Sequence, residues 1–292
     1  MLGIIGDVVQ DVVVWMEEPM RPATDTKSSI VMTRGGSAAN VAAFAGPRYP
    51  TRFIGCVGDD IGGYAVGQEL GSHDVEVKFQ IRDTTGMIVV LIDDAGERMM
   101  FPSRGASGKL EPIDEAWLDG IELLHITGYS LQEDPTASST IDAARRVKAS
   151  GGELSLDISS TGMIDLYGLE RFKALVKELR PDFISANADE SRMLDLTDAA
   201  GAGPGEFLND LPEVVLLARA GKEATRIFRG AEAVATVPVV PSTDVRDMTG
   251  AGDAFNGGFL TSWLRTRDLV ASCEAGHALA RKVLAHPGAS EG

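Results

Sequence analysis

Residues 246–255 carry the spacing with the clearest chemical meaning, the run Arg-Asp-Met-Thr-Gly-Ala-Gly-Asp-Ala-Phe. Small residues stand directly before Asp253, and apolar residues then recur every three or four positions, which predicts an amphipathic helix over 253–265. A glycine-rich turn at the start of a helix points backbone N–H groups outward at the positive end of the helix dipole. Such a turn suits phosphate or another anion.

The presence of Asp253 beside this turn needs a separate explanation, because a carboxylate repels a bound phosphate. The acid makes sense if it removes a proton from a hydroxyl while the backbone N–H groups hold the charge of a transferred group. The alternative is a tight strand-to-helix turn in which Asp253 only caps the helix. The local string leaves both interpretations open.

Short apolar runs alternate with helical patterns along the chain. The predicted buried strands lie at 2–5, 51–57, 123–127, 153–158, 183–186 and 214–219. The predicted helices between them lie at 38–46, 64–70, 138–149, 169–179 and 190–194. This alternation predicts an α/β fold with a mostly parallel central sheet and helices on both faces. Ligands of such sheets bind beyond the carboxyl ends of the strands.

Two segments, 8–33 and 85–102, break the alternation. Each holds two apolar runs, and the second has a turn pattern at 93–96, which is typical of a hairpin. We interpret them as a small separate β-sheet, and ordinary surface hairpins are the alternative.

Composition limits the classes of function. The chain has 292 residues and 44% hydrophobic content, enough for a sizeable core, and no apolar run long enough to cross a membrane. Its 27 Lys and Arg against 43 Asp and Glu give a net charge of −16, which argues against nucleic acid and anionic membranes as partners. The first residues lack a secretory signal pattern, and Cys56 and Cys273 are expected to be free thiols in a reducing cytoplasm.

The run before and including Asp253 resembles the C-terminal signature of the ribokinase-like (PfkB) family of sugar and nucleoside kinases, with Met248 in place of a Thr. Residues 35–42, Gly-Gly-Ser-Ala-Ala-Asn-Val-Ala, resemble the family's N-terminal signature. The resemblance covers nearly the whole chain. It implies a ribokinase-like three-layer sandwich, one kinase domain over 1–292, with the segments approximately 8–33 and 85–102 as a lid over the substrate.

The resemblance also implies roles at the glycine-rich turn of residues 250–252, which is called the anion turn from here on. Asp253 is the expected base, and Gly250, Ala251 and Gly252 are expected to form an anion hole through their backbone N–H groups. The phosphoryl donor is expected to be ATP with Mg²⁺.

On the acceptor side, the resemblance points to Asp11, Gly36 and Asn40. A carboxylate such as Asp11 can accept two hydrogen bonds from a vicinal diol. Arg104 follows the second lid segment and could meet an acidic or phosphorylated sugar, or pair with a lid carboxylate.

On the nucleotide side, Asn187 and Glu190 resemble the family's Asn-x-x-Glu motif, with Glu190 near Mg²⁺ through water. A helix start capped by Asn187 is the alternative for that motif. Gly221 lies in a partly matching loop, where Arg219 replaces the usual Thr and is either a triphosphate contact or a solvated surface cation.

The end of the chain resembles the family's last nucleotide loop. The resemblance implies nucleotide contacts at Thr249 and Gly288, and a monovalent cation such as K⁺ at Asp247 and at carbonyl groups near residues 249 and 288.

The expected function is ATP-dependent phosphorylation of a primary hydroxyl of a small sugar or sugar derivative, by a homodimer formed through the lid. A nucleoside kinase of the same family and a non-catalytic sugar- or nucleotide-binding protein on the same fold are the alternatives. Ribokinase carries Asn and Lys where this chain has Val9 and Ser37, which argues against ribose itself.

Overall fold

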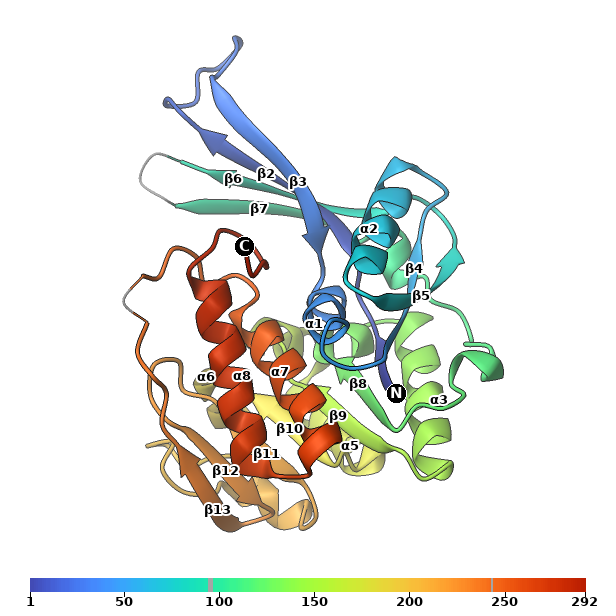
Figure 1. Ribbon diagram of the computed structural model, residues 1–292, viewed down its shortest axis with the longest axis vertical. Helices are drawn as coiled ribbons and strands as arrows, with labels where there is room; N and C mark the ends of the chain where they lie inside the picture. The colour runs from blue at the N-terminus through green and yellow to red at the C-terminus, as the bar shows by residue number, and fades with distance from the viewer. Residues whose placement is uncertain (94–96, 243) are drawn as a thin grey trace.

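The computed structural model describes residues 1–93, 97–242 and 244–292. Its main sheet has strand order β13-β12-β11-β10-β9-β8-β1-β4-β5 (Figure 1). Neighbouring strands are parallel, except that β12 and β13 join antiparallel at one edge. The bounds are β1 Leu2–Ile5, β4 Thr51–Val57, β5 Val75–Ile81, β8 Leu123–Thr127, β9 Glu153–Asp157, β10 Phe183–Ala186, β11 Val215–Ala218, β12 Thr225–Arg229 and β13 Glu232–Val237.

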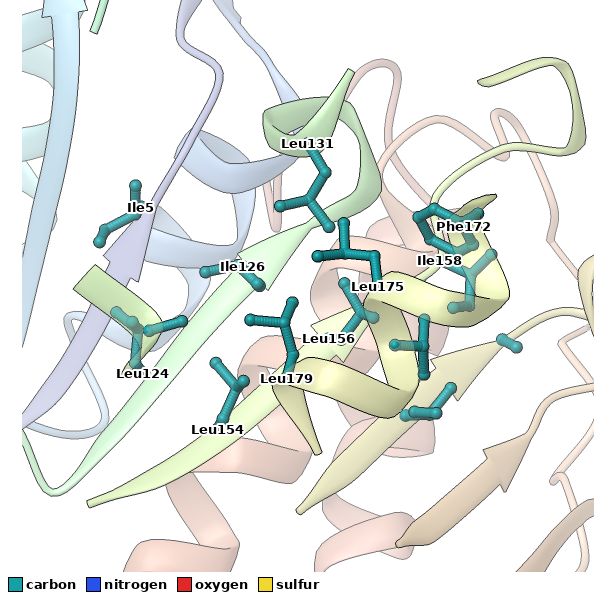
Figure 2. Packing of buried hydrophobic residues seen from close by; sticks show 14 of the residues in the cluster. Ile5, Leu124, Ile126, Leu131, Leu154, Leu156, Ile158, Phe172, Leu175 and Leu179 are labelled. Atoms are coloured by element: carbon teal, nitrogen blue, oxygen red, sulfur yellow. The ribbon is translucent and has the colours of Figure 1, made fainter. Parts of the chain in front are cut away.

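Helices cover both faces of this sheet, because the side chains of its buried strands alternate between two apolar clusters. Leu2 and Ile4 pack with Phe255 and Phe259 on one face, whereas Ile5 packs toward the other. Leu154, Leu156, Leu175 and Leu179 pack together in that second cluster (Figure 2). The helices are α1 Ser37–Ala45, α2 Ile61–Ser72, α3 Thr136–Ala149, α4 Thr161–Tyr167, α5 Leu169–Leu179, α6 Ala188–Met193, α7 Ala251–Thr266 and α8 Leu269–Leu284.

A second sheet of four strands projects from the main body (Figure 1). Its order is β3-β2-β6-β7, with β2 and β6 parallel and the two outer pairs antiparallel. The small sheet expected from the sequence is therefore present, whereas the predicted turn at 93–96 lies largely outside the described residues. The bounds are β2 Val9–Met16, β3 Ser28–Gly35, β6 Gly86–Ile92 and β7 Arg98–Ser103.

The predicted buried strands agree with the structure to within one residue at either end. Sequence reasoning missed the edge hairpin β12–β13. Each of its strands mixes apolar with polar residues and lacks the long apolar run of a strand that is buried on both faces. It also missed α8, because the buried face of that helix includes the small residues Ser272, Cys273 and Gly276. Every helix in the described ranges is too short or too polar to cross a membrane.

Candidate active site

The anion turn is the N-terminus of α7. Gly250 is the N-cap, with φ 77° in the left-handed region that favours glycine. A Cβ added there would lie 2.5 Å from Cβ of Ala289, so the C-terminal loop also needs glycine at this position. The N–H of Ala251 donates to the Met248 carbonyl at 3.3 Å. The next N–H groups have no helical acceptor ahead of them, so the turn keeps donors for an anion.

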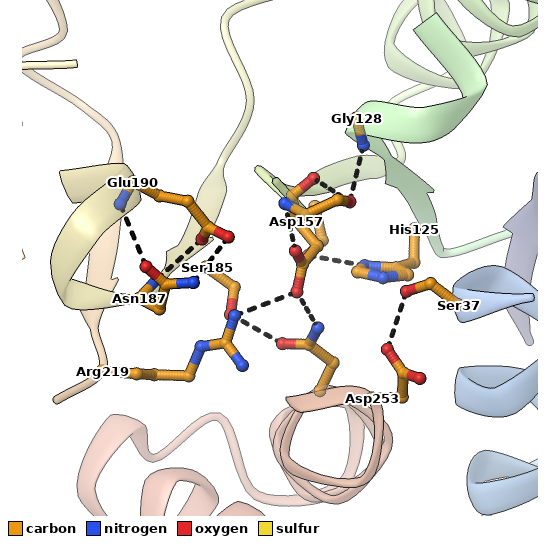
Figure 3. Close-up of polar contacts among 12 residues, drawn as sticks. Ser37, His125, Gly128, Asp157, Ser185, Asn187, Glu190, Arg219 and Asp253 are labelled. Carbon is orange, nitrogen blue, oxygen red and sulfur yellow. Dashed lines mark hydrogen bonds and ion pairs between the residues drawn. The ribbon is translucent and has the colours of Figure 1, made fainter. Parts of the chain in front are cut away.

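Asp253 lies in the first turn of α7, against the first turn of α1. Its Oδ1 accepts a hydrogen bond from Ser37 Oγ at 2.7 Å, and Oδ2 accepts one from Asn40 Nδ2 at 2.9 Å (Figure 3). Burial is the main reason that the pKa of Asp253 is raised to about 7; the neighbouring Asp157 and Asp7 also raise it, and the two hydrogen bonds oppose the shift. A carboxylate with a pKa near neutrality is well suited to act as a base.

Gly36 and Asp7 position α1 for this contact. The Asp7 carboxylate accepts hydrogen bonds from the N–H groups of Ser37 at 2.7 Å and Ala38 at 3.3 Å. Gly36 has φ 95°, and a Cβ there would lie 2.5 Å from the Asp7 carbonyl oxygen. The geometry thus gives Gly36 a structural role, because only glycine permits this close approach.

Asp11 on β2 has an unused hydrogen-bond acceptor. Its Oδ1 is buried and has no partner within the described part of the chain. A Cβ at Gly35 would lie 2.1 Å from that oxygen, so the carboxylate packs directly on the backbone of β3. Burial raises the pKa of Asp11 to about 6, against the opposing charge of Arg34. A buried acceptor without a partner is suited to a hydroxyl group of a ligand.

Arg104 joins the base of the lid to the main body. Its guanidinium donates to the Tyr129 carbonyl at 3.0 Å and to the Gln132 side chain, and lies 4.0 Å from the Glu133 carboxylate. The carboxylate that Arg104 meets in this structure therefore belongs to the main body and not to the lid.

A buried polar network missed by sequence reasoning lies beside the turn. Asp157, at the carboxyl end of β9, pairs with Arg219 at 3.2 Å and accepts a hydrogen bond from Asn256 (Figure 3). Asn256 in turn accepts from Ser185 Oγ at 2.7 Å. Its position at a strand end was the available signal for Asp157.

Arg219 is part of this network. Its side chain is only 16% exposed, so the interpretation as a solvated surface cation is wrong. A Cβ at Gly252 would lie 2.6 Å from Nη1 of Arg219, which places the guanidinium against the anion turn. Gly221, two residues further on, has φ 61° in an exposed turn and makes no close side-chain contact.

Asn187 and Glu190 form a reciprocal cap at the start of α6. Glu190 accepts from Asn187 N at 2.8 Å and from Nδ2 at 2.7 Å, so the helix-cap arrangement is present. Glu190 is nevertheless buried, and that burial, together with the charge of Asp157, raises its pKa to about 7. Within the described ranges no group of three or more His, Cys, Asp or Glu could hold a metal directly. Glu190 and Asp157 therefore suit a Mg²⁺ that is bound mainly through water and phosphate.

Just before the anion turn, the Asp247 side chain contacts both Thr249 and Gly288. Asp247 accepts from Thr249 N at 2.8 Å and Oγ1 at 2.7 Å, from Gly288 N at 2.9 Å, and from Arg98 Nη2 at 2.7 Å. Burial alone would raise its pKa, but the hydrogen bonds from Arg98, Gly288 and Thr249 outweigh burial and hold the pKa at about 2. The carboxylate is therefore ionised at neutral pH and already has four donors.

A glycine turn at a helix N-terminus with Asp253 in the first turn is an arrangement suited to a phosphotransferase of the α/β class. Residues 1–292 match the family described as "pfkB family carbohydrate kinase", so the chain belongs to that family. It is 30% identical over 275 residues to a fructokinase from Vibrio alginolyticus, covering 91% of this chain and 84% of the relative. It is also 30% identical over 274 residues to a fructokinase from Klebsiella pneumoniae, covering 89% and 83%.

Solved structures have the same fold. Adenosine kinase from Sinorhizobium meliloti superposes with a TM-score of 0.84 at 23% identity, covering 99% of this chain and 94% of that one. Adenosine kinase from Schistosoma mansoni in complex with 2-fluoroadenosine gives 0.83 at 16% identity, covering 100% and 97%. The ribokinase-like fold and family membership expected from the sequence are confirmed, and the protein is an ATP-dependent sugar kinase.

Proposed function

We propose that the enzyme transfers the γ-phosphoryl group of ATP to a primary hydroxyl of a small sugar or sugar derivative, with Asp253 as the base. The observation that carries this proposal is the placement of Asp253 at the N-terminus of α7, with its pKa raised to about 7. At that pKa the carboxylate can take the hydroxyl proton at neutral pH as the oxygen attacks. The γ-phosphoryl group then passes in line from ATP to the acceptor oxygen, and ADP leaves.

The charge of the transferred group is held on the opposite side of Asp253. Gly252 and its neighbours present N–H groups with the dipole of α7 behind them, and the Arg219 guanidinium lies against Gly252. Asp157 pairs with this guanidinium, and its charge also acts on the nearby Glu190. Mg²⁺, when bound with ATP, neutralises phosphate charge. A monovalent cation is not part of the proposed reaction, because Asp247 already has four protein donors.

The acceptor is proposed to bind between the lid base and α1. Asp11 supplies a carboxylate oxygen that has no hydrogen-bond partner among the described residues, and Asn40 donates to Asp253. These groups suit the hydroxyls of a sugar. The two fructokinase relatives at 30% identity favour a sugar over a nucleoside.

We also retain a lid-mediated homodimer as a proposal. Both outer strands of the small sheet expose large apolar side chains, which a second copy could cover. The exposed residues are Ile30, Val31, Met32, Met99, Met100 and Phe101. Cys56 and Cys273 are buried and free, which agrees with a cytoplasmic protein.

The test is an ADP-release assay with Mg-ATP against pentoses, hexoses, sugar acids, sugar phosphates and nucleosides. We expect acceptor-dependent ADP release with one sugar group, and product analysis should place the phosphate on a primary carbon. Release with nucleosides alone would replace the sugar by a nucleoside. No release with any acceptor, from a folded protein that binds ATP in calorimetry, would contradict the catalytic proposal.

A further inference from the structure

We infer that Arg98 supplies, from the lid, the positive charge that a monovalent cation would otherwise bring to the nucleotide loop. The enzyme would then need no K⁺, and the lid and the anion turn would be joined by one ion pair. The inference rests on the proposed phosphoryl transfer at this turn. It makes Arg98 a positioning residue, since it touches Asp247 and Thr249 and not the reacting atoms.

The ion pair joins parts of the chain that are far apart in sequence. Arg98 is at the start of β7, in the small sheet, and β7 lies over the C-terminal segment in Figure 1. Its Nη2 donates to Asp247 Oδ1 at 2.7 Å, and its Nη1 donates to Thr249 Oγ1 at 2.9 Å. Asp247 is only 8% exposed, so this guanidinium neutralises a nearly buried charge.

Two carbonyl oxygens near residue 288 also accept hydrogen bonds within the protein. Carbonyl groups near residue 288 would have to turn toward the ion. Instead, the Gly288 carbonyl accepts from Ser290 N at 3.0 Å, and the Ala289 carbonyl accepts from Arg34 Nη2 at 3.1 Å. Arg34 is buried and lies on β3, which is also a lid strand. Two guanidinium groups thus hold the loop where an ion would need free oxygen ligands.

This arrangement has a consequence for the anion turn. Asp247 binds Thr249 and Gly288 together, and Ala289 packs on Gly250, the N-cap of α7. Holding Asp247 therefore holds both sides of the turn that presents N–H groups to phosphate. A guanidinium is always charged and cannot be lost to solution, so the turn stays ordered whatever the K⁺ concentration.

The test compares Arg98→Ala with Arg21→Ala, a control that removes a guanidinium elsewhere in the lid. Arg21 pairs with Glu18 and the Asp25 carbonyl, away from Asp247. Activity is measured in tetramethylammonium and in K⁺ at equal ionic strength of about 0.1 M, so that screening is matched. We expect the wild type and Arg21→Ala to be indifferent to the cation. We expect Arg98→Ala to lose about tenfold or more without K⁺, and K⁺ or added guanidinium to restore most of it.

A second readout does not need an acceptor or turnover. K⁺ binding to the folded state should raise the melting temperature of Arg98→Ala and leave the wild type unchanged, because a ligand that binds only the native state stabilises it. Arg98→Lys, which keeps the charge, should resemble the wild type in both readouts.

Three results would overturn the inference: a wild type that depends strongly on K⁺, an Arg98→Ala enzyme that keeps wild-type activity without K⁺, or a loss that neither cation restores. An inactive wild type would count against the proposed function alone, and the melting experiment would still decide the role of Arg98.

Discussion

Asp247 and Asp253 lie at opposite ends of one short loop, yet their protonation equilibria differ greatly. The pKa of Asp247 is held at about 2, despite burial, by hydrogen bonds from Arg98, Gly288 and Thr249. The pKa of Asp253 is raised to about 7 by burial and by nearby acids. Asp247 accepts four hydrogen bonds and Asp253 accepts two, and the donors also differ in kind.

Burial sets the high pKa of Asp253, and the donors and neighbouring charges explain why the pKa of Asp247 is low instead. Asp247 meets a guanidinium and backbone N–H groups, which favour the ionised form. Asp253 meets only a hydroxyl and an amide, while Asp157 and Asp7 repel its charge. A carboxylate that stays ionised can hold a loop, whereas one that titrates near neutrality can move a proton. The comparison therefore separates a residue that anchors the loop from the proposed base.

Replacing the base should have the largest effect. Asp253→Asn keeps the size of the side chain but cannot accept the hydroxyl proton, so kcat should fall by about 10²–10⁴-fold with ATP binding nearly unchanged. Steady-state kinetics and calorimetry measure the two quantities. Asp268→Asn is the matched control, since Asp268 caps the neighbouring helix α8. A near-normal kcat for Asp253→Asn would remove it as the base.

A substitution of Asp11 tests whether this third acid contributes only to binding of the acceptor. Asp11→Asn should raise the KM for the acceptor by about tenfold to a hundredfold, because hydrogen bonds from a hydroxyl to a charged carboxylate are lost. The KM for ATP should stay the same. If the acceptor KM and kcat are both unchanged, Asp11 does not contact the acceptor.

The pH profile tests the state of Asp253 directly. A base must be deprotonated, so kcat/KM should fall by about tenfold for each pH unit below about 7. The hydrogen bond from Asn40 lowers this pKa, so Asn40→Ala should move the acid limb to higher pH. If kcat/KM of the wild type falls only near pH 4, the pKa of Asp253 is not raised as described.

The smallest expected effects are on stability, and they have opposite signs. Asp253 binds protons more tightly in the folded than in the unfolded chain, so its ionisation destabilises the fold as pH rises from about 4 to about 7. Asp253→Asn should therefore raise the melting temperature at pH 8 and change it little near pH 4. Asp247 has a lowered pKa, so its contribution is present at neutral pH and is lost only as pH falls through about 2.

Asp247→Asn should accordingly lower stability at pH 8, by about 1–3 kcal/mol, since it weakens buried charged hydrogen bonds. Thermal melts of the two variants at pH 4 and pH 8 provide the measurement. Two shifts of the same sign at pH 8 would contradict the division into anchor and base.

The sequence by itself determined most of the elements and the position of the anion turn. Apolar runs such as Val215–Ala218 become buried strands because burial on both faces of a parallel sheet requires continuous apolar residues. Gly250 before Asp253 marks a helix start because only small, flexible residues bring several N–H groups to one point. Both are local rules, so neighbouring residues are enough to apply them.

Tertiary structure alone decided what these residues can do. Ser37 reaches Asp253 across 216 positions, and Arg98 reaches Asp247 across 149. Such contacts set the pKa values, since burial and nearby charge act through space and not along the chain. For the same reason the sequence left open whether Arg219 was a surface cation. Its pairing with Asp157 exists only because β11 and β9 end at the same edge of the sheet.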